Sequence, residues 1–269
     1  MKSLTKFMII LLLLNLSVSS IYAQTIEETR NISNFKGIHI SSGIDLYIKQ
    51  GGIESVRIVA DKDKMEKIKT EKEGDILKIF AGSSKGWFNF EFNWNNNKTV
   101  KVYVTIKNLK SIAATGGSDV FSEGKLDLIK LDVKATGGSD IKLEVDTDEL
   151  TCETTGGSDV ILSGTATVFK ASSTGGSDLK ASKLRSNFCS VSSTGGSDVY
   201  VWAEKEISIS ATGGSDVYHK GGARVVKSSA TGGSNISCSV QCSAIMRTSS
   251  TLKNTSRLLS TLTFSIRRP

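Results

Sequence analysis

Proline is almost absent from this chain of 269 residues, because the single proline is the last residue, Pro269. No proline-rich linker can therefore divide the chain, although its length alone would allow two domains. We expect one continuous folded body over residues 24–239.

Histidine is also scarce, with only His39 and His219 in the sequence. Both lie in segments with the alternating pattern of strands, where a lone histidine is more often structural than catalytic. The sequence shows no Ser/His/Asp set, no Cys–His pair and no metal-ligand spacing. We therefore predict a protein that is not an enzyme and that uses no metal and no cofactor.

Long apolar runs are confined to the N-terminus, where Lys2 and Lys6 precede the apolar run 7–14 and Ala23 offers a small residue for cleavage. This order is typical of a secretory signal, which we assign to residues 1–23. No cysteine follows the apolar run as a lipid anchor, and no later segment is apolar enough to cross a bilayer. We expect an exported protein in the periplasm, on the outer surface or secreted, with no transmembrane segment in the mature chain.

Acidic residues are missing from the C-terminal tail, which accounts for much of the net charge of +7. All 27 acidic residues lie between Glu27 and Asp216, and of the 34 basic residues two precede residue 24 and five follow residue 239. The body is therefore neutral, with 27 basic residues against 27 acidic ones. A nucleic-acid-binding protein needs a basic face on its folded body, so we expect no nucleic-acid partner.

What the chain does contain is a repeated phrase, Thr-Gly-Gly-Ser-Asp. It recurs every 18–21 residues, and in the last copy Asn235 replaces the aspartate. The copies begin at Thr115, Thr136, Thr155, Thr174, Thr194, Thr212 and Thr231. A fixed period of this length predicts a solenoid, in which each repeat forms one coil stacked on the last.

Apolar residues alternate with polar ones on both sides of each phrase, as in Leu131, Val133 and Ala135 before it and Ile141 and Leu143 after it. The pattern predicts two strands per coil, joined by a tight Gly-Gly-Ser corner and a looser return near residues such as Ser163 and Gly164. One coil cannot cover its own apolar row, so coils must stack at about 4.8 Å spacing.

The aspartate of the phrase falls at the same place in every coil, so the carboxylates should form one column. Its members are Asp119, Asp140, Asp159, Asp178, Asp198 and Asp216. Stacked charges repel by about 1 kcal/mol in water. Either local donors such as corner amides and hydroxyls satisfy the carboxylates, which is the interpretation we favour, or the column is a ladder of bound cations.

Two cysteines lie within the repeats. Cys152 and Cys189 fall at inward positions two coils apart, about 10 Å along the axis, which is too far for a disulfide. We predict buried free thiols.

In residues 86–97 the aromatics alternate with Asn and Glu, which suits either a sugar-binding face or packing on the first coils. The candidate ligand-binding side chains are Trp87, Phe90, Phe92 and Trp94.

Residues 30–110 lack the phrase but contain alternating strand patterns, and we expect them to continue the coils, with a short helix or an exposed excursion at residues 61–73. Their opening, with 35–40 and 43–48 ahead of the serial Thr-Gly-Gly-Ser-Asp coils, resembles the head GIN domain family, labelled auto-transporter adhesins and common in Bacteroidetes. The resemblance covers about residues 30–239. It implies a right-handed parallel β-helix at the cell surface or secreted.

The tail departs from this pattern, since residues 240–269 are rich in Ser and Thr, lack Gly and end in Arg267-Arg268-Pro269. We interpret it as a divergent or disordered end that contributes little stability.

Taken together, the residues predict an all-β, single-stranded parallel β-helix with coils of about 18–21 residues. The function we infer is that of a non-enzymatic surface or matrix protein in adhesion or carbohydrate contact, with a surface glycan or another surface protein as partner. The alternatives are a polysaccharide-active β-helix enzyme and a purely structural spacer. Parallel β-helices can house such enzymes, but these coils are short and uniform.

Overall fold

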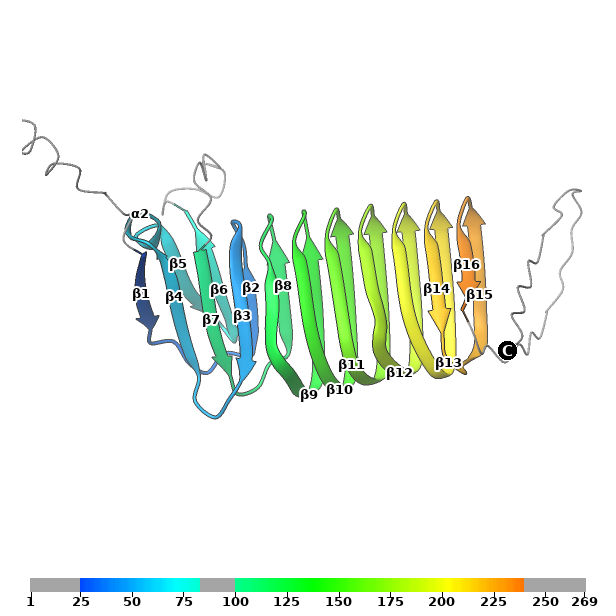
Figure 1. The fold of residues 1–269 in the computed structure, drawn as a ribbon, viewed down its shortest axis with the longest axis horizontal. Coiled ribbons are helices and arrows are strands. Elements are labelled where there is room, and N and C mark those ends of the chain that lie inside the picture. The colour runs from blue at the N-terminus through cyan, green and yellow to red at the C-terminus, as the bar shows by residue number, and fades with distance from the viewer. Residues whose placement is uncertain (1–24, 83–99, 240–269) are drawn as a thin grey trace, which may run out of the picture.

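The computed structural model describes residues 25–82 and 100–239, which form a stack of parallel coils, a β-solenoid of about 7 turns (Figure 1). This confirms the predicted fold class. The predicted signal sequence 1–23, the aromatic segment with Trp87, Phe90, Phe92 and Trp94, and the tail 240–269 lie outside the described residues. Within the described ranges, no helix has the length and apolar character needed to cross a membrane.

Five long strands form the repeat body, one for each coil, and each pairs in parallel with the next along the chain. They are β9 (Val120–Thr136), β10 (Asp140–Gly156), β11 (Asp159–Gly175), β12 (Asp178–Gly195) and β13 (Asp198–Gly213). The sequence suggested two strands per coil, but the looser return does not split the coil into two strands. The backbone keeps its ladder through the bend, so that each coil is one long curved strand.

The coil after β13 is interrupted and consists of β14 (Asp216–Lys220) and β15 (Arg224–Gly232), and β16 (Asn235–Cys238) begins the next coil. Strands β14 and β15 both pair with β13, and β16 pairs with β14. The register keeps the repeated phrase aligned, since Thr212 faces Thr231 and Asp216 faces Asn235.

The N-terminal unit comprises eight shorter strands and one helical turn. These are β1 (Thr25–Arg30), β2 (Gly37–Ile40), β3 (Ile44–Gln50), β4 (Ser55–Asp61), α2 (Lys62–Met65), β5 (Ile68–Glu73), β6 (Ile76–Ala81), β7 (Val100–Ile106) and β8 (Ser111–Thr115). The charged stretch 61–73 is thus a single helical turn followed by a strand.

The order of these strands in space differs from their order in the chain. Strand β2 lies between β6 and β8, and β3 lies between β7 and β9. The first coil of the chain is therefore enclosed by coils that come later in the sequence. Residues 30–110 therefore extend the stack of coils, although not in chain order, and β2 and β3 have parallel partners on both sides.

Antiparallel strands close the N-terminal end of the column (Figure 1). Strand β4 runs antiparallel to both β7 and β1, and β5 runs antiparallel to β6. The outermost strand on one side, β5, carries exposed charged residues at Lys69, Glu71, Lys72 and Glu73. Charges of this kind prevent an open edge from pairing with another chain.

The Gly-Gly-Ser corner depends on a close approach between coils. The first glycine has a positive φ, as in Gly195 at 93°, and a Cβ there would lie 2.9 Å from the carbonyl oxygen of Gly175 in the preceding coil. The serine is fully buried in every copy except the last, and its hydroxyl can donate to the carbonyl of its own threonine, as from Ser197 to Thr194 at 3.2 Å. The serine therefore locks the turn from inside.

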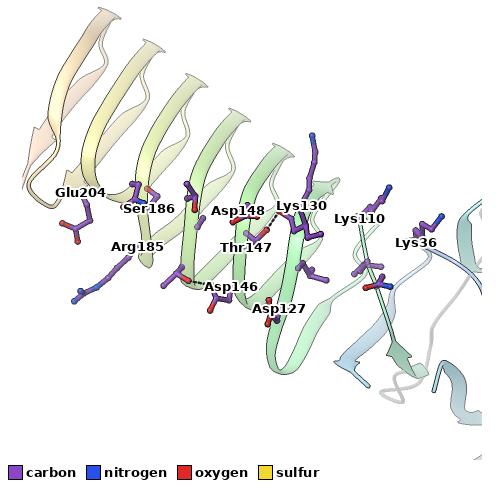
Figure 2. Close-up of a pocket in the computed structure, with 18 residues that line it drawn as sticks. Lys36, Lys110, Asp127, Lys130, Asp146, Thr147, Asp148, Arg185, Ser186 and Glu204 are labelled. Atoms are coloured by element: carbon purple, nitrogen blue, oxygen red, sulfur yellow. Dashed lines mark hydrogen bonds between the residues drawn. The ribbon is translucent and has the colours of Figure 1, made fainter. Parts of the chain in front are cut away.

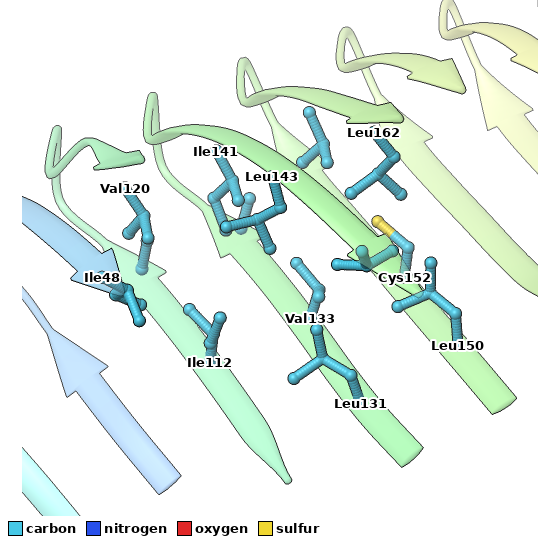
Figure 3. Close-up of a cluster of buried hydrophobic side chains, with 14 of the residues drawn as sticks. Ile48, Ile112, Val120, Leu131, Val133, Ile141, Leu143, Leu150, Cys152 and Leu162 are labelled. Atoms are coloured by element: carbon cyan, nitrogen blue, oxygen red, sulfur yellow. The ribbon is translucent and has the colours of Figure 1, made fainter. Parts of the chain in front are cut away.

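Inward side chains of successive coils form one continuous core (Figure 3). Leu131 packs on Leu150 in the next coil, and Val133 packs on Cys152. Cys152 and Cys189 are buried free thiols, as predicted. Burial in this apolar core raises the pKa of the Cys189 thiol to about 12, so the thiol stays protonated and behaves as a small apolar group.

Candidate functional site

The predicted aspartates lie in one column along the corner of the solenoid. Asp140 faces Asp159, Asp159 faces Asp178, and Asp198 faces Asp216. The column contains one more member than the repeat suggested, because the pairing of Leu46 with Val120 places Asp45 beside Asp119. The repeated phrase is missing before Asp45, so only the spatial insertion of β3 reveals this residue.

Backbone amides of the following coil satisfy part of this negative charge. The Asp140 amide donates to the Asp119 carboxylate at 3.3 Å, and the Asp159 amide donates to the Asp140 carboxylate at 3.4 Å. At the far end the Asn235 amide donates to the Asp216 carboxylate at 3.2 Å. These bonds tie each coil to the next along the corner.

Burial and the neighbouring carboxylates raise the pKa of individual members of the column. Burial, followed by the charges of Asp178 and Asp216, raises the pKa of Asp198. Burial also raises the pKa of Asp119, against the amide bond that lowers it. Lys180 relieves the middle of the column through ion pairs with Asp178 at 3.1 Å and Asp159 at 3.8 Å. In residues 25–82 and 100–239, no three His, Cys, Asp or Glu side chains are grouped to hold a metal ion.

An outward row of side chains runs beside the column, two residues after each aspartate. Aromatic rings gather at both ends of this row: Tyr47 stacks on Tyr103 and Phe121 with centroids 5.1 and 5.3 Å apart, and Tyr200 stacks on Tyr218 at 4.7 Å. The rings cover one another's faces, so they stabilise the stacking of coils. The shared offset from the aspartate is a sequence signal that could have identified this row.

A groove of about 1000 Å³ lies at a place that the sequence did not indicate (Figure 2). It follows a bend where the in–out alternation slips by one residue. In one coil, for example, buried Thr147 and Leu150 are separated by two outward residues, Asp148 and Glu149. The groove therefore crosses the strands and runs along the solenoid.

The floor of the groove consists of one small or apolar side chain from each coil, aligned by the strand register. Leu128 faces Thr147, Thr147 faces Ala166, and Ala166 faces Ser186. The floor hydroxyls are turned toward backbone carbonyls: Thr147 donates to Ile129 at 3.1 Å, and Ser186 donates to Trp202 at 2.7 Å. These hydroxyls are thus engaged by the backbone, and little of each floor side chain is exposed, from 7% for Leu128 to 1% for Ser186.

Polar side chains, together with the exposed Ile129, form a rim on each side of this floor. The residue before each floor position gives one rim, and the residue after it gives the other; the first rim is Asp127, Asp146, Thr165 and Arg185, and the second is Ile129, Asp148, Thr167 and Asn187. Hydrogen bonds from Thr165 and Lys125 lower the pKa of Asp146, which therefore stays ionised at neutral pH.

Charge changes along the groove (Figure 2). Lys36 and Lys110 lie at the N-terminal end, the three rim carboxylates lie in the middle, and Arg185 and Glu204 lie at the other end. The Arg185 guanidinium is held over the Trp202 ring, 4.6 Å from its centroid. An elongated ligand in this groove would meet an apolar floor, polar rims and no net charge overall.

The two histidines lie on strands, as expected, and away from the groove. His39 is on β2 and His219 is buried on β14. Burial lowers the pKa of both rings, so that they are neutral at physiological pH.

Comparison with known proteins gives one family match. Residues 34–223 match the family described as "Putative auto-transporter adhesin, head GIN domain". No match was found among curated proteins.

Solved structures share the fold. A crystal structure from Bacteroides fragilis, described as a putative adhesin, is 24% identical over 81% of this chain and 98% of its own, with a TM-score of 0.71. Another described in the same terms, from Parabacteroides merdae, is 17% identical over 80% and 96%, with a TM-score of 0.61. A protein from Parabacteroides distasonis described as lipid binding is 17% identical over 80% and 97%, with a TM-score of 0.59.

Proposed function

The chain belongs to the family described as "Putative auto-transporter adhesin, head GIN domain", and we propose that it is an exported, non-enzymatic surface protein that adheres to carbohydrate. The observation that carries this proposal is the groove of about 1000 Å³ with an apolar floor between two polar rims. Binding sites for small molecules are typically concave, with an apolar lining and a few polar groups that fix orientation.

Carbohydrate suits this lining better than a purely apolar ligand does. A sugar ring presents C–H groups on its faces and hydroxyls around its edge, which suit a floor that contains Leu128 and Ala166 and rims with Asp148, Thr167 and Asn187. A lipid tail would leave the polar rims without partners, and burying unpaired polar groups is costly.

The environment of one rim carboxylate, Asp146, favours binding over glycoside cleavage. A glycosidase needs one carboxyl group with a raised pKa as its general acid. Asp146 has the opposite environment, since its hydrogen bonds lower its pKa. The groove therefore offers hydrogen-bond acceptors to sugar hydroxyls, and a polysaccharide-active enzyme remains the rival to be tested.

Export rests on the basic and apolar N-terminal sequence together with the family match. An exported protein with a neutral body and an exposed groove can present that groove to glycans outside the cell. Adhesion then follows from many copies on one surface, because multivalent attachment strengthens weak individual contacts.

A glycan array probed with the full chain tests the proposal. The blocking variant is Thr167→Trp, which places a bulky side chain on the exposed rim of coil β11. The control is Ile161→Trp on the same coil, at an outward position that is already 40% exposed and does not line the groove. We expect wild type and control to bind at least one glycan and the blocking variant to lose that binding.

Other outcomes would contradict the proposal. Binding to no glycan, binding to liposomes alone, or glycan binding that Thr167→Trp leaves intact would each show that the groove is not a carbohydrate site. Release of reducing or unsaturated sugars from a bound glycan would show the rival, an enzyme.

A further inference from the structure

The direction of the groove restricts the shape of its ligand. Floor and rim residues are aligned by the register of parallel strands, from Asp127 opposite Asp146 to Thr165 opposite Arg185. A ligand that follows the floor must therefore lie along the solenoid axis, across the strands. A long, narrow chain fits this path, whereas a compact molecule would fill only part of it.

The groove also repeats with the coils. Four consecutive coils contribute a floor residue with a rim residue on each side, namely 127–129, 146–148, 165–167 and 185–187. Adjacent coils are about 4.8 Å apart, the spacing of paired strands. This step is close to the length of one sugar ring in an extended polysaccharide, so successive rings can meet equivalent surroundings.

An extended peptide has no comparable fit. Peptides that add to a sheet use the unpaired backbone groups of an edge strand. In the groove the coils β9 to β12 already pair with one another through the strand ladders. A peptide that crosses these strands could use only its side chains.

The centre of the groove disfavours anionic ligands. Asp127, Asp146 and Asp148 lie on two adjacent coils and line the groove. Asp146 stays ionised because hydrogen bonds from Thr165 and Lys125 lower its pKa. A polymer with a carboxylate or sulfate on each ring would place a negative charge against these groups. Lys36, Lys110 and Arg185 lie toward the ends, and Lys130, which also lines the groove, is paired with Glu149 at 3.5 Å, so these cations do not offset repulsion along the whole chain.

We propose that the groove holds a linear, uncharged polysaccharide parallel to the solenoid axis, with one sugar ring on each of the four coils. The inference rests on the proposed function and specifies the class and length of the ligand. It also gives the repeats a role in binding, because each coil adds one subsite.

The first test measures affinity by titration calorimetry against linear neutral oligosaccharides of increasing length, using cello-, xylo- and manno-oligosaccharides. Oligogalacturonides of matched length provide the charged comparison. For the neutral series that binds, we expect affinity to rise several-fold with each added ring up to about four rings, matching the four coils at the strand spacing, and then to level off. The charged series should bind more weakly at every length.

The second test removes a coil. Deleting residues 156–174 joins Thr155 to Gly175, which restores the repeated phrase and removes the subsite around Ala166. The matched control deletes residues 213–231, which joins Thr212 to Gly232 and removes a coil without lining residues. We expect the plateau to fall by one ring in the first variant and to stay unchanged in the control.

A point substitution covers the case in which the shortened chains fail to fold. Asn187→Trp blocks the last of the four coils and should lower the plateau by one ring. If some glycan binds but affinity is independent of length, or if neither Asn187→Trp nor the deletion moves the plateau, this inference is wrong while the proposed function stands. If no oligosaccharide or array glycan binds, both are wrong.

Discussion

In the repeat body, the backbone amide of Ser139 donates a hydrogen bond to the hydroxyl of Ser158 in the next coil, 19 residues along the chain. In the N-terminal unit, the amide of Ile44 donates the equivalent bond to Ser118, which is 74 residues away in sequence. The bond is the same, with a distance of 3.2 Å in both cases. What differs is how much chain must be ordered before it forms. The repeat body depends on near neighbours and the N-terminal unit on distant ones.

The two regions also differ in their cores. The N-terminal unit buries large aliphatic and aromatic side chains, such as Phe35, Ile44, Leu46 and Ile79, while the repeat body also buries serine, threonine and cysteine. Buried Thr154 and Ser173, for example, are hydrogen-bonded at 2.8 Å. The N-terminal unit thus supplies a dense apolar cap, and the repeat body supplies a regular scaffold that can gain or lose coils.

The largest expected effect comes from deletions in the two regions. Removing residues 37–50 takes β2 and β3 from between their partners, so we expect no cooperative fold. Removing residues 156–174 removes one repeat and should leave a shorter solenoid. Circular dichroism with thermal unfolding distinguishes them. If the chain without residues 37–50 folds cooperatively, or the chain without residues 156–174 does not fold, the contrast between the two regions is wrong.

Glycines at bends give the next largest effect. Gly164 has a φ of 106°, and a Cβ there would lie 2.0 Å from the Val145 carbonyl oxygen. We expect Gly164→Ala to cost about 2–4 kcal/mol of unfolding free energy. In the turn between β5 and β6, Gly74 also has a positive φ, at 58°, but open space surrounds the position of its Cβ. Gly74→Ala should cost only about 1 kcal/mol for its backbone strain.

Gly157→Ala serves as the control for both variants, since Gly157 has open space and no positive φ. Urea unfolding should show little change for this variant. Equal losses for Gly157→Ala and Gly164→Ala would mean that the close approach of coils does not determine the bend.

Smaller effects of opposite sign are expected in the aspartate column. The raised pKa of Asp198 means that its ionisation opposes folding, so its favourable contribution is present below the ordinary aspartate pKa and is lost as pH rises through the folded-state value. We expect Asp198→Asn to raise Tm by roughly 1–3 °C near pH 7, with no gain near pH 3.

Asp140→Asn should instead lower Tm near pH 7 by roughly 1–3 °C, because the Asp140 carboxylate accepts the Asp159 amide. The same sign for both variants in a pH series of thermal melts would show that one effect, repulsion or hydrogen bonding, dominates the whole column.

Calcium should have the smallest effect. If amides and Lys180 satisfy the column, adding calcium in place of a chelator will leave Tm unchanged. A calcium-dependent rise in wild type that Asp159→Asn weakens would instead support the cation ladder over Asp119, Asp140, Asp159, Asp178, Asp198 and Asp216.

The sequence predicts most of the repeat body because each coil repeats the same physical requirements. The phrase fixes the corner and its register, and counting from its threonine correctly places Cys152 and Cys189 inside. The position of β3 could not be predicted in this way, since its partners β7 and β9 are distant in sequence and no phrase marks its register. Asp45 was missed for the same reason.

The groove could not be predicted because its floor repeats in position but not in residue type. Leu128, Thr147, Ala166 and Ser186 share only their place in the coil, and the slip in alternation beside them resembles an ordinary bend. The aromatic segment that suggested sugar binding, with Trp87, Phe90, Phe92 and Trp94, remains a separate prediction outside the described residues.

A crystal structure of the full chain with a bound neutral tetrasaccharide tests the central claim most directly. We predict density for a sugar chain parallel to the solenoid axis, over Leu128, Thr147, Ala166 and Ser186 and within hydrogen-bond distance of Asp148, Thr167 and Asn187. A tetrasaccharide bound at the aspartate column, at the stacked tyrosines or at either end of the solenoid, with the groove empty, would contradict the account.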